Sequence, residues 1–196
     1  NDRPNRERIF ATQVSGTGTT ASLSFSGYYS FLEDDMIAWD NANGHGLGAG
    51  FLGLASSAMA GVAPEQTNGF NIEGLTFAPN GTTAYVAFRA PNEPTTSRDK
   101  ALIVPVTNFT SLLSPSGGTA GSATFGAPIQ LDLGGRGIRS IDRNSSGEYV
   151  TIAGPAGSAT GSTPSDFRLY TWTGNPTDAP SLRSADLTAL NSGGSF

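Results

Sequence analysis

The sequence contains no cysteine among its 196 residues. That absence excludes disulfide bonds, thiolate metal sites and cysteine nucleophiles. Lysine is nearly absent too: Lys100 stands alone beside ten arginines, and the net charge is −5. Because no basic stripe is present, we expect no nucleic-acid partner. We also expect no membrane span, since no apolar run approaches the ~18 residues that a spanning helix needs.

Glycine and proline are abundant instead, with 26 and 12 residues. Together they exceed average usage and indicate many turns between short strands. Helical periodicity is weak along the whole chain, and only residues 51–63 show a pattern that fits a short helix. The composition therefore predicts an all-β fold.

The clearest local pattern is a strand, a tight turn and a second strand within residues 71–91. Leu75 and Phe77 alternate with polar or small neighbours, as in a half-buried strand. Residues 79–81 read Pro-Asn-Gly, in which Asn and Gly tolerate positive φ and Pro presets the entry angle. The stretch therefore predicts a β-hairpin.

The same pattern returns 64 positions later, in residues 137–156. Phe77 aligns with Ile141 and Tyr85 aligns with Tyr149, and turn residues and prolines align as well. Each copy continues into two more short strands, so that one unit holds four strands in order. A repeat of this kind is typical of β-propeller blades, although the commonest blades span ~40–50 residues.

The sequence therefore predicts an all-β fold of four-stranded antiparallel propeller blades, with a generic β-sandwich as the alternative. The predicted parts of this single domain are the outer strands of a preceding blade (8–25), an irregular glycine-rich connection (26–69), a first blade (70–133) and a second blade (134–191).

Two blades are fewer than the 4–8 that a propeller needs in order to close. Residues 193–196 resemble the start of the first unit at Gly69 and Phe70. We therefore expect residues 1–196 to be a fragment of an incomplete propeller, completed by the remainder of the same protein or by a second chain. A self-contained small barrel is the competing interpretation.

Clustered carboxylates occur within the irregular connection, at Asp34, Asp35 and Asp40. Oxygen ligands of this kind suit a hard cation such as calcium. The spacing does not match the EF-hand loop, because Ala42 stands where that loop has its second ligand. A calcium site and a solvated acidic loop both remain open.

His45 is the only histidine and lies in a glycine-rich string, residues 44–50. The string is not a dinucleotide-binding fingerprint, because no βαβ unit surrounds it. A lone histidine can contact a ligand or act as a general base. The alternative is an ordinary loop histidine.

Long connections join the second and third strands of each unit, at residues 90–100 and 154–166. In a propeller they lie where each innermost strand begins, and we call this end the long-loop face. Long loops on a rigid scaffold often carry binding sites. The candidate catalytic residues there are Glu73, Arg136 and Arg139. The candidate ligand-binding residues are Arg89, Arg98, Asp99, Asp166 and His45.

Acidic and basic groups at one face allow two interpretations. One is a structural ion pair that locks neighbouring blades together. The other is a ligand site, in which arginine binds an anion bidentately while Glu73 binds a cation or takes a proton.

Four stretches together resemble a known family: NIEGLTFAPNGTTAYVAFRAP (71–91), ALIVPV (101–106), LDLGGRGIRSI (131–141) and VTIAGPAG (150–157). They are similar to a family of secreted bacterial β-propellers of unknown function. This family is related to the phytase-like proteins, which are also called "esterase-like activity of phytase" proteins. The resemblance extends over residues 34–180. It implies a β-propeller, a secreted or periplasmic location, and hydrolysis of phosphate or other esters.

Two functions follow as hypotheses. The first is an exported propeller that binds a small-molecule or surface ligand on its long-loop face. The alternative is a metal-assisted hydrolase of esters or phosphoesters, in which a metal or Glu73 activates water and arginines stabilise negative charge. No G-x-S-x-G elbow occurs, and a Ser-His-Asp triad would have to draw on His45, so the binding function is favoured.

Overall fold

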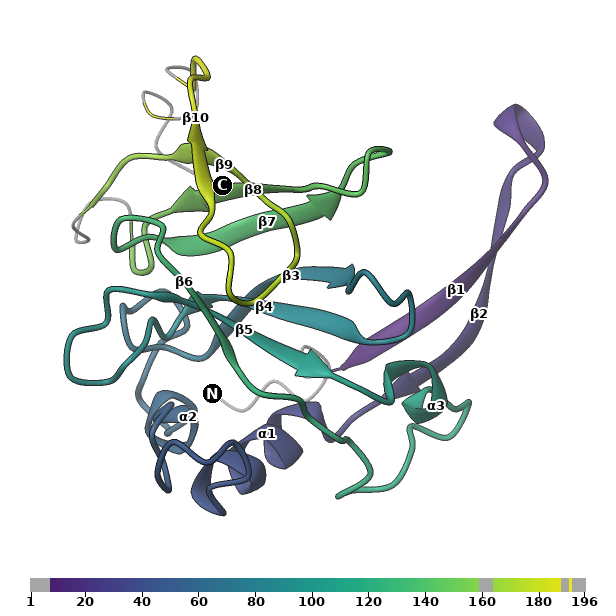
Figure 1. Ribbon diagram of the computed structural model, residues 1–196. Coiled ribbons are helices and arrows are strands. Elements are labelled where there is room, and N and C mark those ends of the chain that lie inside the picture. Colours follow the sequence, from purple (N-terminus) through teal and green to yellow (C-terminus); the bar gives the residue numbers. More distant parts are fainter. Residues whose placement is uncertain (1–7, 159–163, 188–190, 192–196) are drawn as a thin grey trace.

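The computed structural model describes residues 8–158, 164–187 and 191. Its dominant elements are two four-stranded antiparallel sheets, which lie one above the other in Figure 1. A two-stranded hairpin stands beside them, and short helices lie below the first sheet. This arrangement confirms the prediction of a mainly β fold with four-stranded antiparallel sheets. The described residues form no closed barrel or propeller ring.

The first sheet has strand order β3-β4-β5-β6. Its strands are β3 (Asn71–Phe77), β4 (Ala84–Ala90), β5 (Ala101–Val106) and β6 (Ile129–Leu131). The predicted turn between β3 and β4 is confirmed, because the Asn80 side-chain oxygen accepts the N–H groups of Thr82 and Thr83, each at 3.0 Å. All residues of β4 and β5 are buried, since both faces of the sheet are covered there.

The second sheet repeats this order along the chain, from β7 at one edge to β10 at the other. Its strands are β7 (Gly137–Arg143), β8 (Tyr149–Gly154), β9 (Arg168–Trp172) and β10 (Ser181–Arg183). The turn between β7 and β8 uses the same chemistry as the first. Asn144 accepts the N–H groups of Ser146 and Glu148 at 3.0 and 2.9 Å.

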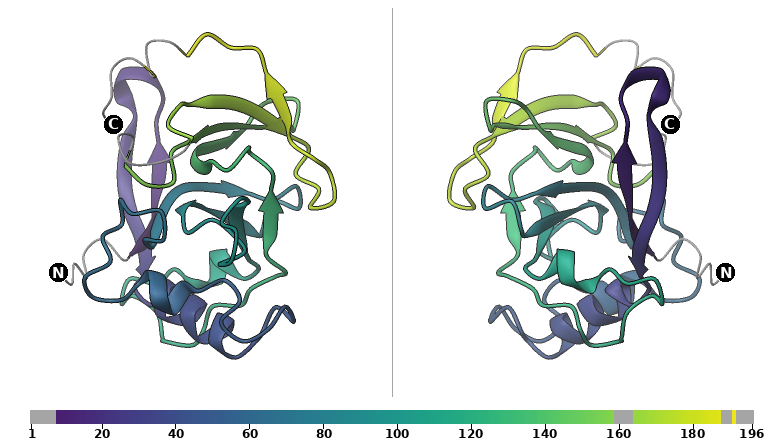
Figure 2. Two further views of the ribbon diagram at one scale, coloured as in Figure 1. Left: turned by 90° about the vertical axis from the view of Figure 1, so that its left-hand side faces the viewer. Right: turned by 90° about the vertical axis from the view of Figure 1, so that its right-hand side faces the viewer.

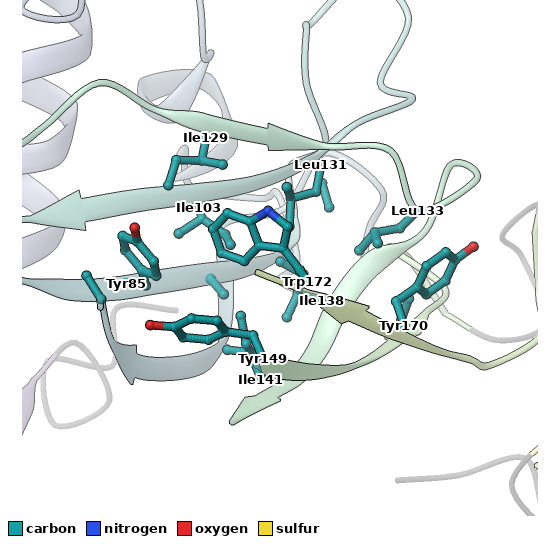
Figure 3. Close-up of a cluster of buried hydrophobic side chains, with 14 residues drawn as sticks. Tyr85, Ile103, Ile129, Leu131, Leu133, Ile138, Ile141, Tyr149, Tyr170 and Trp172 are labelled. Carbon is teal, nitrogen blue, oxygen red and sulfur yellow. The ribbon is translucent and has the colours of Figure 1, made fainter. Parts of the chain in front are cut away.

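The two sheets pack against each other through an apolar layer (Figure 3). Tyr85 of the first sheet packs against Tyr149 and Trp172 of the second, with the three rings tilted to one another and their centroids 5.4–6.0 Å apart. Each tyrosine also donates a hydrogen bond to a backbone carbonyl of the other unit: the Tyr149 hydroxyl donates to the Phe77 carbonyl at 2.5 Å, and the Tyr85 hydroxyl donates to the Gly174 carbonyl at 3.1 Å. These repeat-related residues thereby fix one sheet on the other.

Three helices lie against the opposite face of the first sheet: α1 (Leu32–Asn41), α2 (Leu54–Ser57) and α3 (Phe109–Leu112) (Figure 1). The short helix expected within residues 51–63 is present as α2. The longest helix, α1, lies inside the connection predicted to be irregular. Its inward-facing residues are Leu32, Asp35, Met36 and Asp40, and half of these are acidic. The sequence therefore lacks the apolar stripe that normally reveals a helix.

The hairpin consists of β1 (Ile9–Ser15) and β2 (Ser22–Tyr29), with a 3-10 turn, η1 (Gly18–Thr20), at its tip. It extends away from the helices and stands apart from both sheets (Figures 1 and 2). The chain stretch predicted as outer strands of a preceding blade thus pairs with itself in antiparallel fashion.

Among the described residues, no helix combines the length and apolar character needed to cross a membrane. Residues 193–196, where a third unit was expected to begin, lie outside the described residues.

Candidate functional site

The long connections of the two sheets converge at one end of the molecule. The Arg89 guanidinium at the end of β4 donates to the carbonyls of Ala156 and Gly157 at 3.0 and 2.6 Å. The Asn92 side chain donates to the Gly135 carbonyl at 3.1 Å. Both contacts join a loop of the first sheet to a loop of the second, so the long-loop face is continuous across the two sheets.

Matching bulges lie at this face in β3 and β7, the edge strands that begin the two sheets. Glu73 is the extra residue in β3, between the pairs formed by Ile72 and Gly74. Arg139 is the extra residue in β7, between the pairs formed by Ile138 and Ser140. A bulge re-aims the side chain that it carries, and bulges are frequent beside functional sites.

The two bulged residues meet across the sheets, with Arg89 as a third member. Glu73 Oε2 accepts a hydrogen bond from Arg139 Nε at 2.5 Å, and Glu73 Oε1 accepts one from Arg89 Nη1 at 3.1 Å. The glutamate side chain is 26 % exposed, whereas the arginine side chains are 10 % and 11 % exposed. Two guanidinium groups and one carboxylate leave a net charge of +1 in this cluster.

Backbone and aromatic groups hold the two guanidinium groups in place. Arg139 Nη1 donates to the Pro155 carbonyl at 3.4 Å, and its guanidinium carbon lies 5.3 Å from the ring centroid of Phe167. Such a cation–π contact orients the planar group. Among the described residues, Arg139 Nη2 has no hydrogen-bond partner, so this nitrogen can still donate to a ligand.

A second ion-pair chain lies on the same face. Arg136 donates to the Asp166 carboxylate, which also accepts from Arg168 Nε at 2.6 Å. Burial acts to raise the pKa of Asp166, but the hydrogen bonds from Arg136 and Arg168 outweigh it and lower the pKa below its usual value. Arg136 also donates to the carbonyls of Leu133 and Gly134 at 3.2 Å, so it closes the entry loop of the second sheet.

An open hollow of about 550 Å³ adjoins Asp166 at the outer edge of the second sheet. Charged and apolar side chains line it: Asp166, Phe167, Arg168, Leu169, Leu182 and Arg183 among others. Its size falls in the range of small-molecule pockets.

Arg98 and Asp99 lie farther along the first long loop. Arg98 Nη1 donates to the Asn92 carbonyl at 3.2 Å. The Asp99 carboxylate accepts from Ser97 Oγ at 2.8 Å. Both side chains thus shape their own loop, and neither contacts Glu73 or Arg139 among the described residues.

The acidic residues of α1 hold loops in place. Asp35 accepts the Tyr29 hydroxyl at 2.5 Å and the N–H groups of Gly121 and Ala123 at 2.7 and 2.9 Å. Asp34 is exposed. Within residues 8–158, 164–187 and 191, no three His, Cys, Asp or Glu side chains gather as a metal site would require. The structure therefore does not bring Asp34, Asp35 and Asp40 together.

The helices on the first sheet, together with the loop that joins α1 to α2, are called the helical layer below. His45 and Asp40 form a buried pair within it. His45 Nε2 lies 3.0 Å from Asp40 Oδ1, and both side chains are fully buried. His45 Nδ1 accepts a hydrogen bond from the Leu47 N–H at 3.1 Å. The ring hydrogen is therefore on Nε2, which donates a hydrogen bond to Asp40. Asp40 also accepts the N–H groups of Leu52 and Leu54 at 3.0 Å each. With both ring nitrogens occupied, His45 anchors the glycine-rich string rather than facing a ligand.

Several groups of the long-loop face carried no recognisable signal in the sequence. The arginines are positioned by Phe167 and by the carbonyls of Pro155, Ala156 and Gly157. The residue types at these positions do not indicate that role. Glu93 is fully buried, and neither of its carboxylate oxygens has a hydrogen-bond partner in the part of the chain that the structure describes. It lies between two prolines in a polar stretch, where the sequence pattern predicts exposure.

Comparison with protein-family models, with curated protein sequences and with solved structures finds no match for this chain. The function proposed below therefore rests on residues of the chain itself.

Proposed function

We propose that this protein binds an anionic ligand, a carboxylate or a phosphate, on its long-loop face, as part of an exported β-propeller. The observation that supports the proposal is the bulged pair Glu73 and Arg139, which meets Arg89 in a cluster of net charge +1. Both guanidinium groups already bind a carboxylate, that of Glu73, which is the kind of planar oxygen acceptor that a ligand would present.

Glu73 occupies the position that a ligand carboxylate would take. Its side chain is the most exposed of the three, so an incoming anion reaches the cluster on the glutamate side. The free Nη2 of Arg139 supplies the first contact, and the ligand then competes with Glu73 for the guanidinium groups.

Binding is favoured over hydrolysis by the state of the two candidate bases. Both oxygens of Glu73 accept hydrogen bonds from arginine, and both nitrogens of His45 are engaged within the helical layer. A general base needs a free lone pair within reach of the proton that it removes. The ring nitrogens of His45 offer none, and the Glu73 oxygens are held by two guanidinium groups.

The propeller part of the proposal is supported by the two similar sheets, which have the same strand order and pack face to face. We propose that the two sheets are consecutive blades and that other strands, from the same protein or a second chain, complete the ring. Native mass spectrometry of the purified protein tests this: a mass above that of the 196 residues, in one longer polypeptide or in a second one, supports it, and a mass equal to these residues alone contradicts it. The exported location is proposed on the family resemblance, and cell fractionation tests it.

The binding proposal is tested by titrating the protein with inorganic phosphate and with citrate while following thermal unfolding. A ligand at 100 times its Kd should stabilise the folded protein by about 2.7 kcal/mol. Arg139→Lys should abolish the stabilisation, because lysine keeps the charge but loses the planar fork.

Arg143→Lys is the matched control, since Arg143 ends the same strand and donates to the Gly147 carbonyl at the opposite turn. It should bind like the wild type. Equal anion stabilisation in the wild type and in Arg139→Lys would contradict the site, and no stabilisation in the wild type would contradict the function.

A further inference from the structure

Glu93 is an acid buried without a hydrogen-bond partner. Its exposure is 0 %, and neither carboxylate oxygen is paired among the described residues. Asp40 is equally buried, but its oxygens accept three hydrogen bonds. Buried polar side chains are nearly always hydrogen bonded, so the isolation of Glu93 needs a physical explanation.

The residue lies where its loop docks on the helical layer. Its backbone exchanges hydrogen bonds with Lys100 at 2.7 and 2.8 Å, which closes residues 93–100 into a small loop. The loop then packs on Gly53, the residue before α2: a Cβ on Gly53 would lie only 2.7 Å from Thr95 Cγ2. The loop and the start of α2 are therefore in close contact at this point.

Two charged groups act on Glu93 from the elements packed around it. Burial is the largest influence and raises the pKa of Glu93; Arg98 of the same loop lowers it, and Asp40 of α1 raises it, to about 9 in total. Asp40 stays fixed because His45 and two backbone amides bind it. At neutral pH the docked loop therefore carries a protonated Glu93.

Loss of that proton raises the free energy of the docked loop. An isolated carboxylate in a dry environment is far less stable than one in water. Undocking the loop exposes the carboxylate to solvent without disturbing the β4–β5 ladder, which ends before the loop begins.

We propose that Glu93 is a protonation-controlled anchor: the loop of residues 92–100 stays docked on the helical layer while the carboxyl group holds its proton, and undocks when that proton is lost. The proposal does not depend on the anionic ligand. Since the loop forms part of the long-loop face, its docking makes the shape of that face sensitive to alkaline pH.

The sign and size of the effect follow from linkage. The docked carboxyl has a pKa raised from 4.5 to about 9, so docking is fully favoured below pH 4.5 and loses stability as the pH rises toward 9. Within that window the ratio of docked to undocked loop should fall about tenfold for each pH unit.

The test is a carboxyl-detected NMR titration of the wild-type protein, combined with amide exchange of Glu93 and Lys100. We expect the Glu93 carboxyl to titrate well above neutral pH. After correction for intrinsic exchange, protection of the two amides should fall about tenfold per pH unit in the wild type.

Glu93→Gln keeps the shape but cannot ionise, so its protection should not depend on pH. Asp99→Asn, an exposed acid of the same loop, serves as the control and should behave like the wild type. A Glu93 carboxyl that titrates below pH 6 in the folded protein would overturn the proposal. So would an equal pH slope in Glu93→Gln. The wild-type titration decides the question even if that variant does not fold.

Discussion

Glu73 and Arg139 occupy the same bulge position in β3 and β7, the first strands of two neighbouring sheets, and their side chains meet at 2.5 Å. The ion pair therefore joins the two sheets at the long-loop face. At the opposite end, the Tyr149 hydroxyl reaches the Phe77 carbonyl and completes the connection. Polar contacts thus lie at both ends of the apolar layer. Together they fix the position of one sheet on the other.

The first prediction is that Glu73 and Arg139 are energetically coupled. In a double-mutant cycle with Glu73→Gln and Arg139→Gln, urea unfolding should give a coupling free energy of about 1–3 kcal/mol, because both side chains are mostly buried. The exposed pair Arg183 and Glu148 is the control. Its coupling should stay at about 0.2–1 kcal/mol. Equal coupling in the two pairs would mean that the bulged pair does not lock the sheets.

Gly137 gives a second prediction, which concerns how closely the sheets approach. A Cβ built on Gly137 would lie 1.8 Å from the Arg89 carbonyl oxygen, and the neighbour is backbone that cannot rotate away. Gly137→Ala should therefore lower the free energy of unfolding by at least ~2 kcal/mol, through a forced shift of β7 from β4.

Gly126→Ala is the comparison variant, because its nearest neighbour would be the Pro105 side chain at 3.3 Å. Chemical denaturation should show a small change for this variant. A Gly137→Ala protein as stable as the wild type would show that β7 moves freely relative to the first sheet.

Much of the strand architecture could be predicted from the sequence, because hairpins depend on local chemistry. The turns at Asn80 and Asn144 depend on their side-chain oxygens. The flanking alternation indicates strands but not which residues face the core, because Leu75 and Phe77 are 47 % and 43 % exposed. The helix α1 could not be predicted in this way, since Asp35 and Asp40 occupy half of its buried positions. Buried carboxylates that accept backbone amides look like solvent-exposed acids in a sequence.

The sequence predicts which residues form the candidate site, but not which of them bind each other. Glu73, Arg89, Arg136, Arg139 and Asp166 were placed on one face because the four-stranded repeat puts their loops at one end. The 64-residue spacing aligns Glu73 with Gly137, whereas the bulges make Glu73 equivalent to Arg139. One extra residue in a strand is invisible to a pattern of alternation, and the partner of Glu73 was therefore unspecified.

Asp166 gives a third prediction, which concerns how the free energy of unfolding changes at acid pH. Its pKa is lowered in the folded protein, because hydrogen bonds from Arg136 and Arg168 outweigh the opposing effect of burial. A depressed folded pKa contributes stability that is present above the unfolded value of 3.8 and is lost as the pH falls through the folded value. With its side chain 33 % exposed, solvent screening keeps the contribution on the order of 1 kcal/mol.

Asp166→Asn should therefore be less stable than the wild type at pH 6, and the difference should shrink as the pH falls below 3.8. Urea unfolding at a series of pH values between 2 and 7 measures this. Asp142→Asn, at an exposed acid near the end of β7 whose carboxylate accepts the Arg143 N–H at 2.7 Å, provides the reference for loss of a carboxylate that no arginine side chain binds among the described residues. A deficit in Asp166→Asn that stays constant across the whole series would show that the carboxylate acts through its shape and hydrogen bonds alone. Arg136 would then hold the entry loop of the second sheet through the Leu133 and Gly134 carbonyls without help from charge.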